Sequence, residues 1–317
     1  MVEIIDFGLE DYGEVLERQT RLFEELVSFK VGKLEGFKVG KLEGGKDVLL
    51  SGEFKVESLK LKENSIGGGE TEEGQLKGGE VEKGGKEYIL IGEHYPVITL
   101  GRRAAEMNVI LPDSVLDKKG IKKYHIGRGG DVTFHGPGQL ILYPILDLEK
   151  HRLGVKEYVN ILEETVIRLL DKYGIKGERI EGATGVWIGK GTEEERKICA
   201  MGIKCSRFCT MHGLALNVDM DLSGFKMINP CGFKDKGVTS IYEEIKRKRE
   251  RSRQDCGKGS EDYREGEILA ASIEKDRDDI DRFKDEDVPN MKKIKEDLLR
   301  IFLSLVFPFE EVFDFLK

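Results

Sequence analysis

Two long polar segments interrupt this chain and restrict its folded core to the residues outside them. Residues 29–36 (FKVGKLEG) are repeated without change at residues 37–44, and glycine, lysine and glutamate dominate from there to about residue 86. In a second run, residues 243–289, charged side chains of both signs predominate. Such sequences bury too little apolar surface to offset the conformational entropy lost on folding. We therefore predict a single domain over residues 1–317 with polar insertions at about 29–86 and 243–289.

Each insertion has more than one interpretation. For the first, a flexible loop between a helix and a strand is favoured over a partner-binding arm. In the second, the basic residues 246–249 are typical of nucleic-acid binding, but the acidic residues within 276–287 would compete for them. A solvated helix or a disordered segment explains the second insertion better.

Composition and charge exclude several classes of protein. The net charge of −8 over 317 residues argues against nucleic-acid binding, because neutralising phosphates needs a positive surface. No apolar run is long enough to span a bilayer, and the first residues lack the pattern of a signal peptide. The five cysteines form an odd set, which disfavours a disulfide framework. We expect a cytoplasmic protein that binds neither nucleic acid nor a membrane.

The spacing of apolar residues outside the insertions predicts a mixture of helices and strands. Helical spacing predicts helices over residues 11–27, 155–173 and 291–306, and Asn290 is placed to cap the last of them. Short apolar runs predict strands over residues 88–94, 97–100, 123–126, 140–146, 186–189, 197–204 and 213–218. This pattern is typical of an α/β fold.

Residues 127–139 (GRGGDVTFHGPGQ) are predicted to form a glycine-rich turn. The glycines allow the backbone to approach a ligand closely, and Arg128 and His135 add hydrogen-bond donors. The segment is not a Walker loop, because the Gly-Lys-Ser/Thr ending is absent, and its glycine spacing differs from a dinucleotide fingerprint. Tight-turn geometry alone explains such a segment equally well.

Two further segments contain side chains suited to chemistry. Residues 197–202 (KICAMG) are predicted to lie in a strand, where alternation would put Lys197, Cys199 and Met201 on one face. In residues 229–232 (NPCG), a proline and a glycine bracket Cys231 in a tight bend that can expose its thiol. By itself, a cysteine in such a bend is as compatible with an inert thiol as with a reactive one.

Cysteines near a histidine also raise the question of a metal site. The spacing of Cys199, Cys205, Cys209 and His212 matches no common zinc-ligand pattern. Alternation also places Cys199 and Cys205 in strands. We therefore expect no bound metal and no other cofactor.

Taken together, these segments resemble the lipoyl(octanoyl) transferase family. The matching segments, which agree with the family in content and order, are residues 127–139 continuing to Tyr143 and Pro144, 197–202, 211–217 (MHGLALN), 229–232 and 238–241 (VTSI). Residues 93–97 and 101–102 extend the match upstream, so that it covers roughly residues 88–242. The two polar insertions depart from the family pattern.

The resemblance implies a fold and a reaction. The fold would be the α/β catalytic domain of biotin and lipoate protein ligases, a mixed sheet with helices packed mainly on one side. The reaction would move an octanoyl group from octanoyl-acyl carrier protein to a lysine of lipoyl domains, in 2-oxoacid dehydrogenases and the glycine cleavage H protein. Cys231 would carry the acyl group as a thioester, and Lys197 would activate the thiol and act as general acid and base.

The resemblance also implies substrate contacts. It assigns them to Arg128, Gly129, Gly130, Asp131, Val132, Thr133, Phe134, His135, Ala200, Met201, Gly202, Gly213, Leu214 and Ala215. The first alternative function is an ATP-dependent lipoate or biotin protein ligase, which forms an adenylate and needs no cysteine nucleophile. A non-catalytic scaffold whose polar inserts bind partners is the second alternative.

Overall fold

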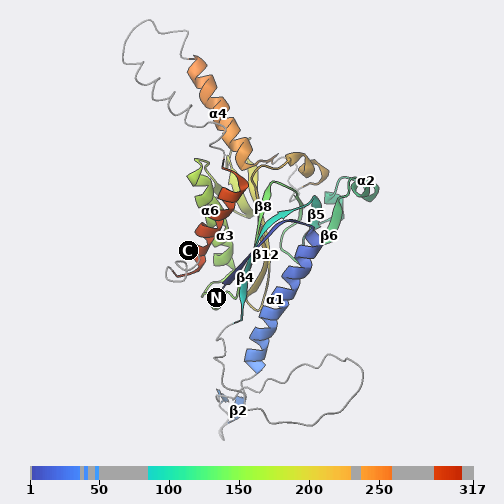
Figure 1. The fold of residues 1–317 in the computed structure, drawn as a ribbon, viewed down its shortest axis with the longest axis vertical. Coiled ribbons are helices and arrows are strands. Elements are labelled where there is room, and N and C mark those ends of the chain that lie inside the picture. The colour runs from blue at the N-terminus through green and yellow to red at the C-terminus, as the bar shows by residue number, and fades with distance from the viewer. Residues whose placement is uncertain are drawn as a thin grey trace, which may run out of the picture.

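A computed structural model of the chain describes residues 2–35, 39–41, 47–49, 85–229, 237–258 and 289–308. Figure 1 shows a mixed α/β body in which helices α1 and α4 reach beyond the sheet at opposite ends. Cys231 and most of both predicted insertions lie outside the described residues. The proposed division of the chain into one domain and two insertions therefore stays a prediction.

A mixed sheet forms the centre of the molecule, with strands in the order β1-β4-β8-β12-β11-β10-β9. These strands, with β13 beside β11, are β1 (Val2–Glu10), β4 (Glu87–His94), β8 (Gln139–Ile145), β12 (Cys209–Asn217), β11 (Arg196–Ser206), β10 (Ala183–Ile188), β9 (Glu178–Ile180) and β13 (Gly237–Val238). The β1–β4 and β11–β13 pairs are parallel, whereas the other neighbours are antiparallel. The predicted mixed α/β fold is confirmed.

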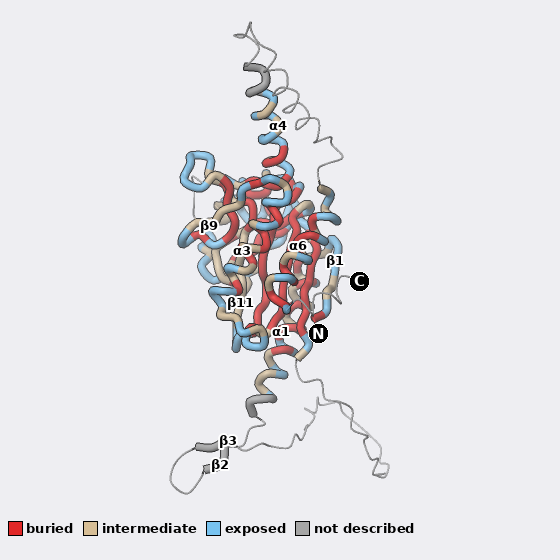
Figure 2. Tube along the Cα trace, turned by 90° about the vertical axis from the view of Figure 1, so that its left-hand side faces the viewer, coloured by how far each residue is buried: buried red, intermediate tan, exposed pale blue. Residues whose placement is uncertain are grey.

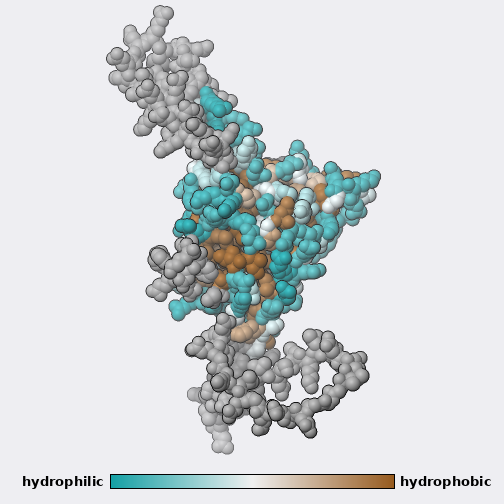
Figure 3. All heavy atoms as spheres, viewed as in Figure 1, coloured by the Kyte–Doolittle hydropathy of each residue, from teal (hydrophilic) through white to brown (hydrophobic). Residues whose placement is uncertain are grey.

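Helices cover both faces of this sheet. Helices α3 (Val155–Lys172) and α6 (Met291–Val306), with the start of α4 (Ile241–Lys258), pack on one face, and α1 (Tyr12–Glu35) packs on the other. Figure 2 shows the buried residues concentrated along the strands next to α3 and α6. In Figure 3 the described surface is mainly hydrophilic, and apolar side chains gather near the middle of the face that carries β1.

A second, three-stranded sheet includes part of the glycine-rich segment as its strand β7 (Val132–His135). Its order is β6 (Lys122–His125), β5 (Val97–Leu100), β7. Helix α2 (Asp113–Lys118) and the short 3-10 helices η1 (Glu106–Asn108) and η2 (Leu222–Met227) lie in the connections around it. Strands β2 (Val39–Lys41) and β3 (Asp47–Leu49) pair separately in the first polar segment.

The predicted helices and strands are present, but α1 continues to Glu35, into the segment predicted as an insertion, and β12 begins at Cys209 and not at residue 213. Asn290 caps α6 as predicted, because its side chain accepts a hydrogen bond of 2.9 Å from the Lys293 N–H. The sequence did not predict β1, an edge strand in which charged and apolar residues mix without clear alternation. It also missed β7, which lies inside the glycine-rich segment that was predicted to be a turn.

Gly213 in the middle of β12 tests how tightly the central strands pack. A Cβ at this position would lie 2.1 Å from the Leu142 carbonyl oxygen of β8, a backbone atom that cannot move away cheaply. We expect Gly213→Ala to lower the free energy of unfolding by about 3 kcal/mol, as overpacking does in a dense core. Equilibrium unfolding in urea measures this change.

Gly32 in α1 is the matched control. A Cβ there would meet no atom within 4 Å, so Gly32→Ala should leave stability unchanged or raise it by up to about 1 kcal/mol. Equal stability of Gly213→Ala and the unsubstituted protein would contradict the packing described for β12.

Candidate functional site

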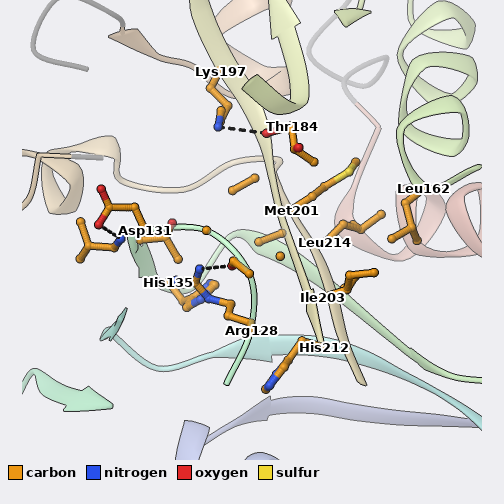
Figure 4. Close-up of a pocket in the computed structure, with 18 of the residues that line it drawn as sticks. Arg128, Asp131, His135, Leu162, Thr184, Lys197, Met201, Ile203, His212 and Leu214 are labelled. Carbon is orange, nitrogen blue, oxygen red and sulfur yellow. Dashed lines mark hydrogen bonds between the residues drawn. The ribbon is translucent and has the colours of Figure 1, made fainter. Parts of the chain in front are cut away.

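A cavity of about 520 Å³ lies where β11 and β12 meet the glycine-rich segment of residues 128–135. Figure 4 shows Lys197 and Thr184 at one end of the cavity and His212 at the other, with Leu162 entering from α3. The cavity size is in the range of sites that bind small molecules. The structure thus brings distant segments of the chain to one place.

All but one of the predicted substrate-contacting residues line this cavity together with Lys197. They are Arg128, Gly129, Gly130, Asp131, Val132, Thr133, His135, Ala200, Met201, Gly202, Gly213, Leu214 and Ala215. The exception is Phe134, whose ring packs edge-on against Phe225 with the ring centroids 5.9 Å apart. Because consecutive strand residues face opposite sides, Thr133 and His135 face the cavity while Phe134 faces the core of the small sheet. Contacts with a substrate stay a prediction.

The glycine-rich segment packs directly on β11. The Gly129 N–H donates a hydrogen bond of 2.8 Å to the Ile203 carbonyl. A Cβ on Gly202 would lie 2.6 Å from the Gly129 carbonyl oxygen, so this close approach needs glycine at position 202. One wall of the cavity is therefore fixed to the strand that carries Lys197.

Arg128 anchors the same wall to the small sheet. Its guanidinium is buried and donates hydrogen bonds of 2.9 Å to both the carbonyl and the hydroxyl oxygen of Thr99 in β5. A further bond of 3.0 Å reaches the Gly129 carbonyl. These contacts show Arg128 holding the shape of the glycine-rich segment.

A β-bulge decides the direction of Lys197, and the prediction that it shares a face with Cys199 is wrong. Val186 of β10 pairs with Cys199 of β11, but the next residue, Trp187, pairs with Lys197, which leaves Ile198 as an extra residue. Directly paired residues share a face and consecutive residues alternate. Lys197 therefore lies on the opposite face from Cys199.

Contacts on the two faces agree with this assignment. Cys199 is fully buried with Val186 in the core that includes α3, and this burial raises the pKa of its thiol. The Lys197 Nζ lies 4.5 Å from the centre of the Trp187 ring and donates a hydrogen bond of 3.2 Å to the Thr184 carbonyl. The ammonium group thus lies at the cavity wall beside a carbonyl oxygen and an aromatic face.

Cys231 lies outside the described residues, but the described residues on both sides of its segment are tied to the cavity wall. On one side, the Asn229 N–H donates a hydrogen bond of 2.7 Å to the Asn108 carbonyl, and the Asn108 amide donates one of 2.8 Å to Asp131. On the other side, Gly237 and Val238 line the cavity, and Val238 pairs with Lys197.

Two buried histidines form part of the cavity lining, and both are neutral near pH 7. Burial is the main cause that lowers the pKa of His135 to about 3, and the next is the repulsion that its protonated ring would meet from a protonated His94. Its Nδ1 lies 2.7 Å from the Gln139 side-chain oxygen, which only accepts, so Nδ1 carries the hydrogen. Burial also lowers the pKa of His212 to about 3.

His212 also has a backbone conformation that is rare within a strand. Its φ is 62°, in the left-handed region that non-glycine residues seldom adopt. Its N–H donates a hydrogen bond of 3.2 Å to the side-chain oxygen of Gln19 in α1. Strain of this kind persists where surrounding contacts enforce it, often at functional sites. No local pattern in the sequence predicts this conformation.

The sequence also did not identify several side chains that line the cavity. Val159 and Leu162 come from α3, whose apolar stripe predicted only core packing. Thr184 and Trp187 come from β10. With Met201, Ile203 and Leu214, the α3 residues form an apolar part of the cavity. Among the described residues, none form a cluster of three or more acidic, histidine or cysteine side chains placed to hold a metal ion.

Comparison with known proteins identifies the family. Residues 79–255 match the model of the lipoyl protein ligase A/B catalytic domain. A curated octanoyltransferase of Flavobacterium johnsoniae is 49% identical over 244 residues, which cover 77% of this chain and 87% of that protein. The chain belongs to this family. An octanoyltransferase of Parabacteroides distasonis is 55% identical over 154 residues, covering 48% of this chain and 70% of that protein.

Family membership confirms the predicted resemblance and the predicted class of enzyme, an acyltransferase. Among solved structures, the lipoate-protein ligase A bound with ATP is 15% identical to this family member, with a TM-score of 0.44 over 69% of this chain and 72% of that chain. No helix in the described parts of this acyltransferase combines the length and the apolar character needed to cross a membrane.

The buried histidines predict how stability depends on pH. A histidine whose pKa is about 3 when folded and 6.5 when unfolded binds fewer protons in the folded state between these values. The free energy of unfolding should therefore fall as the pH drops below about 6.5, by about 1.4 kcal/mol per pH unit for each such histidine. Urea unfolding at a series of pH values measures this slope.

His212→Asn isolates one of these contributions, since asparagine tolerates a positive φ. We expect this variant to reduce the slope between about pH 6 and pH 4 by about 1.4 kcal/mol per pH unit. Phe208→Asn, at an exposed position with the same φ of 62°, removes no titratable group and is the control that should keep the original slope. An unchanged slope in His212→Asn would contradict the buried, neutral state of His212.

Proposed function

We propose that this acyltransferase moves an octanoyl group from an acyl carrier protein to a lysine of a lipoyl domain, through a thioester on Cys231. One observation carries the proposal. Lys197 reaches the cavity wall at the strand position where the segment after Cys231 rejoins the sheet, because Lys197 and Val238 are direct partners. Acyl transfer between a thiol and an amine requires a nucleophilic thiol and a group that moves protons, and we propose Cys231 and Lys197 for these two roles.

The cavity suits a hydrocarbon chain beside a charged group. One part of the cavity has an apolar lining, formed by Leu162, Met201, Ile203 and Leu214. Lys197 lies at the polar end of the cavity, beside Thr184. An octanoyl chain that enters the apolar part would leave its carbonyl carbon near the polar end. The octanoyltransferases of Flavobacterium johnsoniae and Parabacteroides distasonis support this acyl group by their similarity to the chain.

The first half-reaction is an exchange between thioesters. The Sγ of Cys231 attacks the carbonyl carbon of the donor, and the bond from that carbon to the carrier thiol breaks. A free thiol has a pKa near 8.5, so a neighbouring ammonium group is needed to favour the thiolate at neutral pH. Lys197 supplies this charge and then gives its proton to the departing carrier thiolate.

The second half-reaction forms an amide. Neutral Lys197 accepts a proton from the acceptor lysine amine as its nitrogen bonds to the carbonyl carbon, and the bond to the Sγ of Cys231 breaks. The thiolate and the ammonium group are then restored. Because an amide is more stable than a thioester, the sequence runs without ATP. We propose the lipoyl domains of 2-oxoacid dehydrogenases and the glycine cleavage H protein as acceptors.

Intact-mass analysis after incubation with octanoyl-acyl carrier protein tests the nucleophile. We expect the enzyme to gain the mass of an octanoyl group, located on Cys231 by peptide mapping. Cys231→Ser should show no such adduct, because a serine hydroxyl is not activated by a lysine placed for a thiol. Cys205→Ser, which removes the partly buried thiol of β11, is the control and should be acylated normally. Full acylation of Cys231→Ser would refute this assignment.

The role of Lys197 is tested without any donor. Lys197→Ala should slow alkylation of Cys231 by iodoacetamide near neutral pH on the order of 10-fold, because the thiolate loses its nearby positive charge. Lys190→Ala, at an exposed turn position, is the matched control and should react like the unsubstituted enzyme. Peptide mapping restricts the measurement to Cys231, and equal rates in Lys197→Ala would overturn the ion-pair proposal.

A further inference from the structure

Next to Lys197, Arg196 forms a buried ion pair with Glu244 of α4. The guanidinium donates two hydrogen bonds to the carboxylate, from Nε to Oε1 at 2.7 Å and from Nη2 to Oε2 at 2.6 Å. Arg196 is 7% exposed and Glu244 is 8% exposed. Burial alone would raise the pKa of Glu244, but hydrogen bonds from Arg196 and Thr239 outweigh it and hold this pKa below its usual value. Such two-point pairs fix the orientation of both side chains.

Thr239 connects the same carboxylate to the backbone of Lys197. The Thr239 hydroxyl donates to Oε1 of Glu244, and the Thr239 N–H donates a hydrogen bond of 3.0 Å to the Lys197 carbonyl. Thr239 directly follows β13, which pairs with β11 at Arg196 and Lys197. Glu244 therefore holds the side chain before Lys197 and, through Thr239, the carbonyl of Lys197 itself.

From Thr239, buried hydrogen bonds continue to the opposite wall of the cavity. The side-chain N–H of Asn217 donates a hydrogen bond of 2.8 Å to the Thr239 carbonyl, and its side-chain oxygen accepts one of 2.9 Å from Gln139. The side-chain oxygen of Gln139 in turn accepts a hydrogen bond from His135. His135 lies 3.3 Å from the Thr99 hydroxyl, which Arg128 also binds. The chain of contacts thus links Glu244 to the glycine-rich wall. Its members, all buried, are Arg196, Glu244, Thr239, Asn217, Gln139, His135, Thr99 and Arg128.

We propose that Glu244 is a positioning residue for Lys197. It fixes the rotation of β11 at the bulge, and so sets where the ammonium group enters the cavity relative to the opposite wall. The inference rests on the proposed role of Lys197, which activates the thiol of Cys231. Glu244 does not line the cavity and lies in the charged run that the sequence assigned to an insertion. Its influence on the reaction is therefore indirect, through Arg196 and Thr239.

A double-mutant cycle separates positioning from general stability. Glu244→Gln keeps the size of the side chain but removes its charge, and we expect it to slow formation of the acyl-enzyme on the order of 100-fold at saturating octanoyl-acyl carrier protein. In a Lys197→Ala background the same substitution should cost nothing further, because the group that it positions is already absent. Glu250→Gln, on the exposed face of α4, is the control and should leave the rate unchanged.

Iodoacetamide alkylation of Cys231 gives a second readout that needs no donor. The pH midpoint of alkylation in Glu244→Gln should move upward, toward that of Lys197→Ala. If the unsubstituted enzyme gave no acyl-enzyme, the proposed function would fail, and the alkylation profile would still test the positioning role. A normal acyl-enzyme in the unsubstituted protein with an unchanged Glu244→Gln profile would overturn the positioning role alone.

The variant Glu244→Gln removes the buried anion of Arg196 and leaves its guanidinium only the longer ion pair with the exposed Glu194, at 3.7 Å, a loss that can unfold the protein. Arg196→Met combined with Glu244→Gln removes both charges, a change that buried pairs often tolerate. We expect this double variant to fold, as judged by its thermal unfolding, and to show the same loss of acylation as Glu244→Gln. A folded double variant that forms the acyl-enzyme at the wild-type rate refutes the proposal. So does a Glu244→Gln substitution that slows acyl-enzyme formation equally in the presence and absence of Lys197.

Discussion

The site depends on the one-residue bulge at Ile198. In a regular β11, Lys197 would share the face of Cys199 and point into the apolar core beneath α3, where an ammonium group is costly to bury. The extra residue turns Lys197 to the face of Trp187 and the cavity. β-bulges often re-aim a side chain next to an active site, and the contacts of Arg196 with Glu244 hold this one in place.

Features set by neighbouring residues could be predicted from the sequence, and features set by distant partners could not. The cap of α6 at Asn290 and the apolar spacing of α3 follow from local patterns. The bulge at Ile198 depends on how β10 pairs with β11, which no spacing within β11 reveals. The positive φ of His212 is likewise enforced from outside its strand.

The burial of Glu244 also depends on distant partners and could not be predicted from the sequence. A charged run indicates a solvated segment, and most carboxylates within such runs are exposed. This one is buried because only two residues separate α4 from β13, and the first turn of α4 places Glu244 against Arg196. Lys197 and the glycine-rich wall, both within the family motifs, line one cavity. They gave no sign of the buried contacts that join these two walls through Asn217.

Dependence on ATP distinguishes direct acyl transfer from ligation most sharply. The measurement is octanoylation of a lipoyl domain by this enzyme from octanoyl-acyl carrier protein, in a reaction freed of nucleotides and followed by intact mass. The proposed dyad of Cys231 and Lys197 predicts that the lipoyl domain gains an octanoyl group at an undiminished rate without ATP. Transfer that occurs only after ATP is added would contradict it, since an adenylate and not a cysteine thioester would then carry the acyl group.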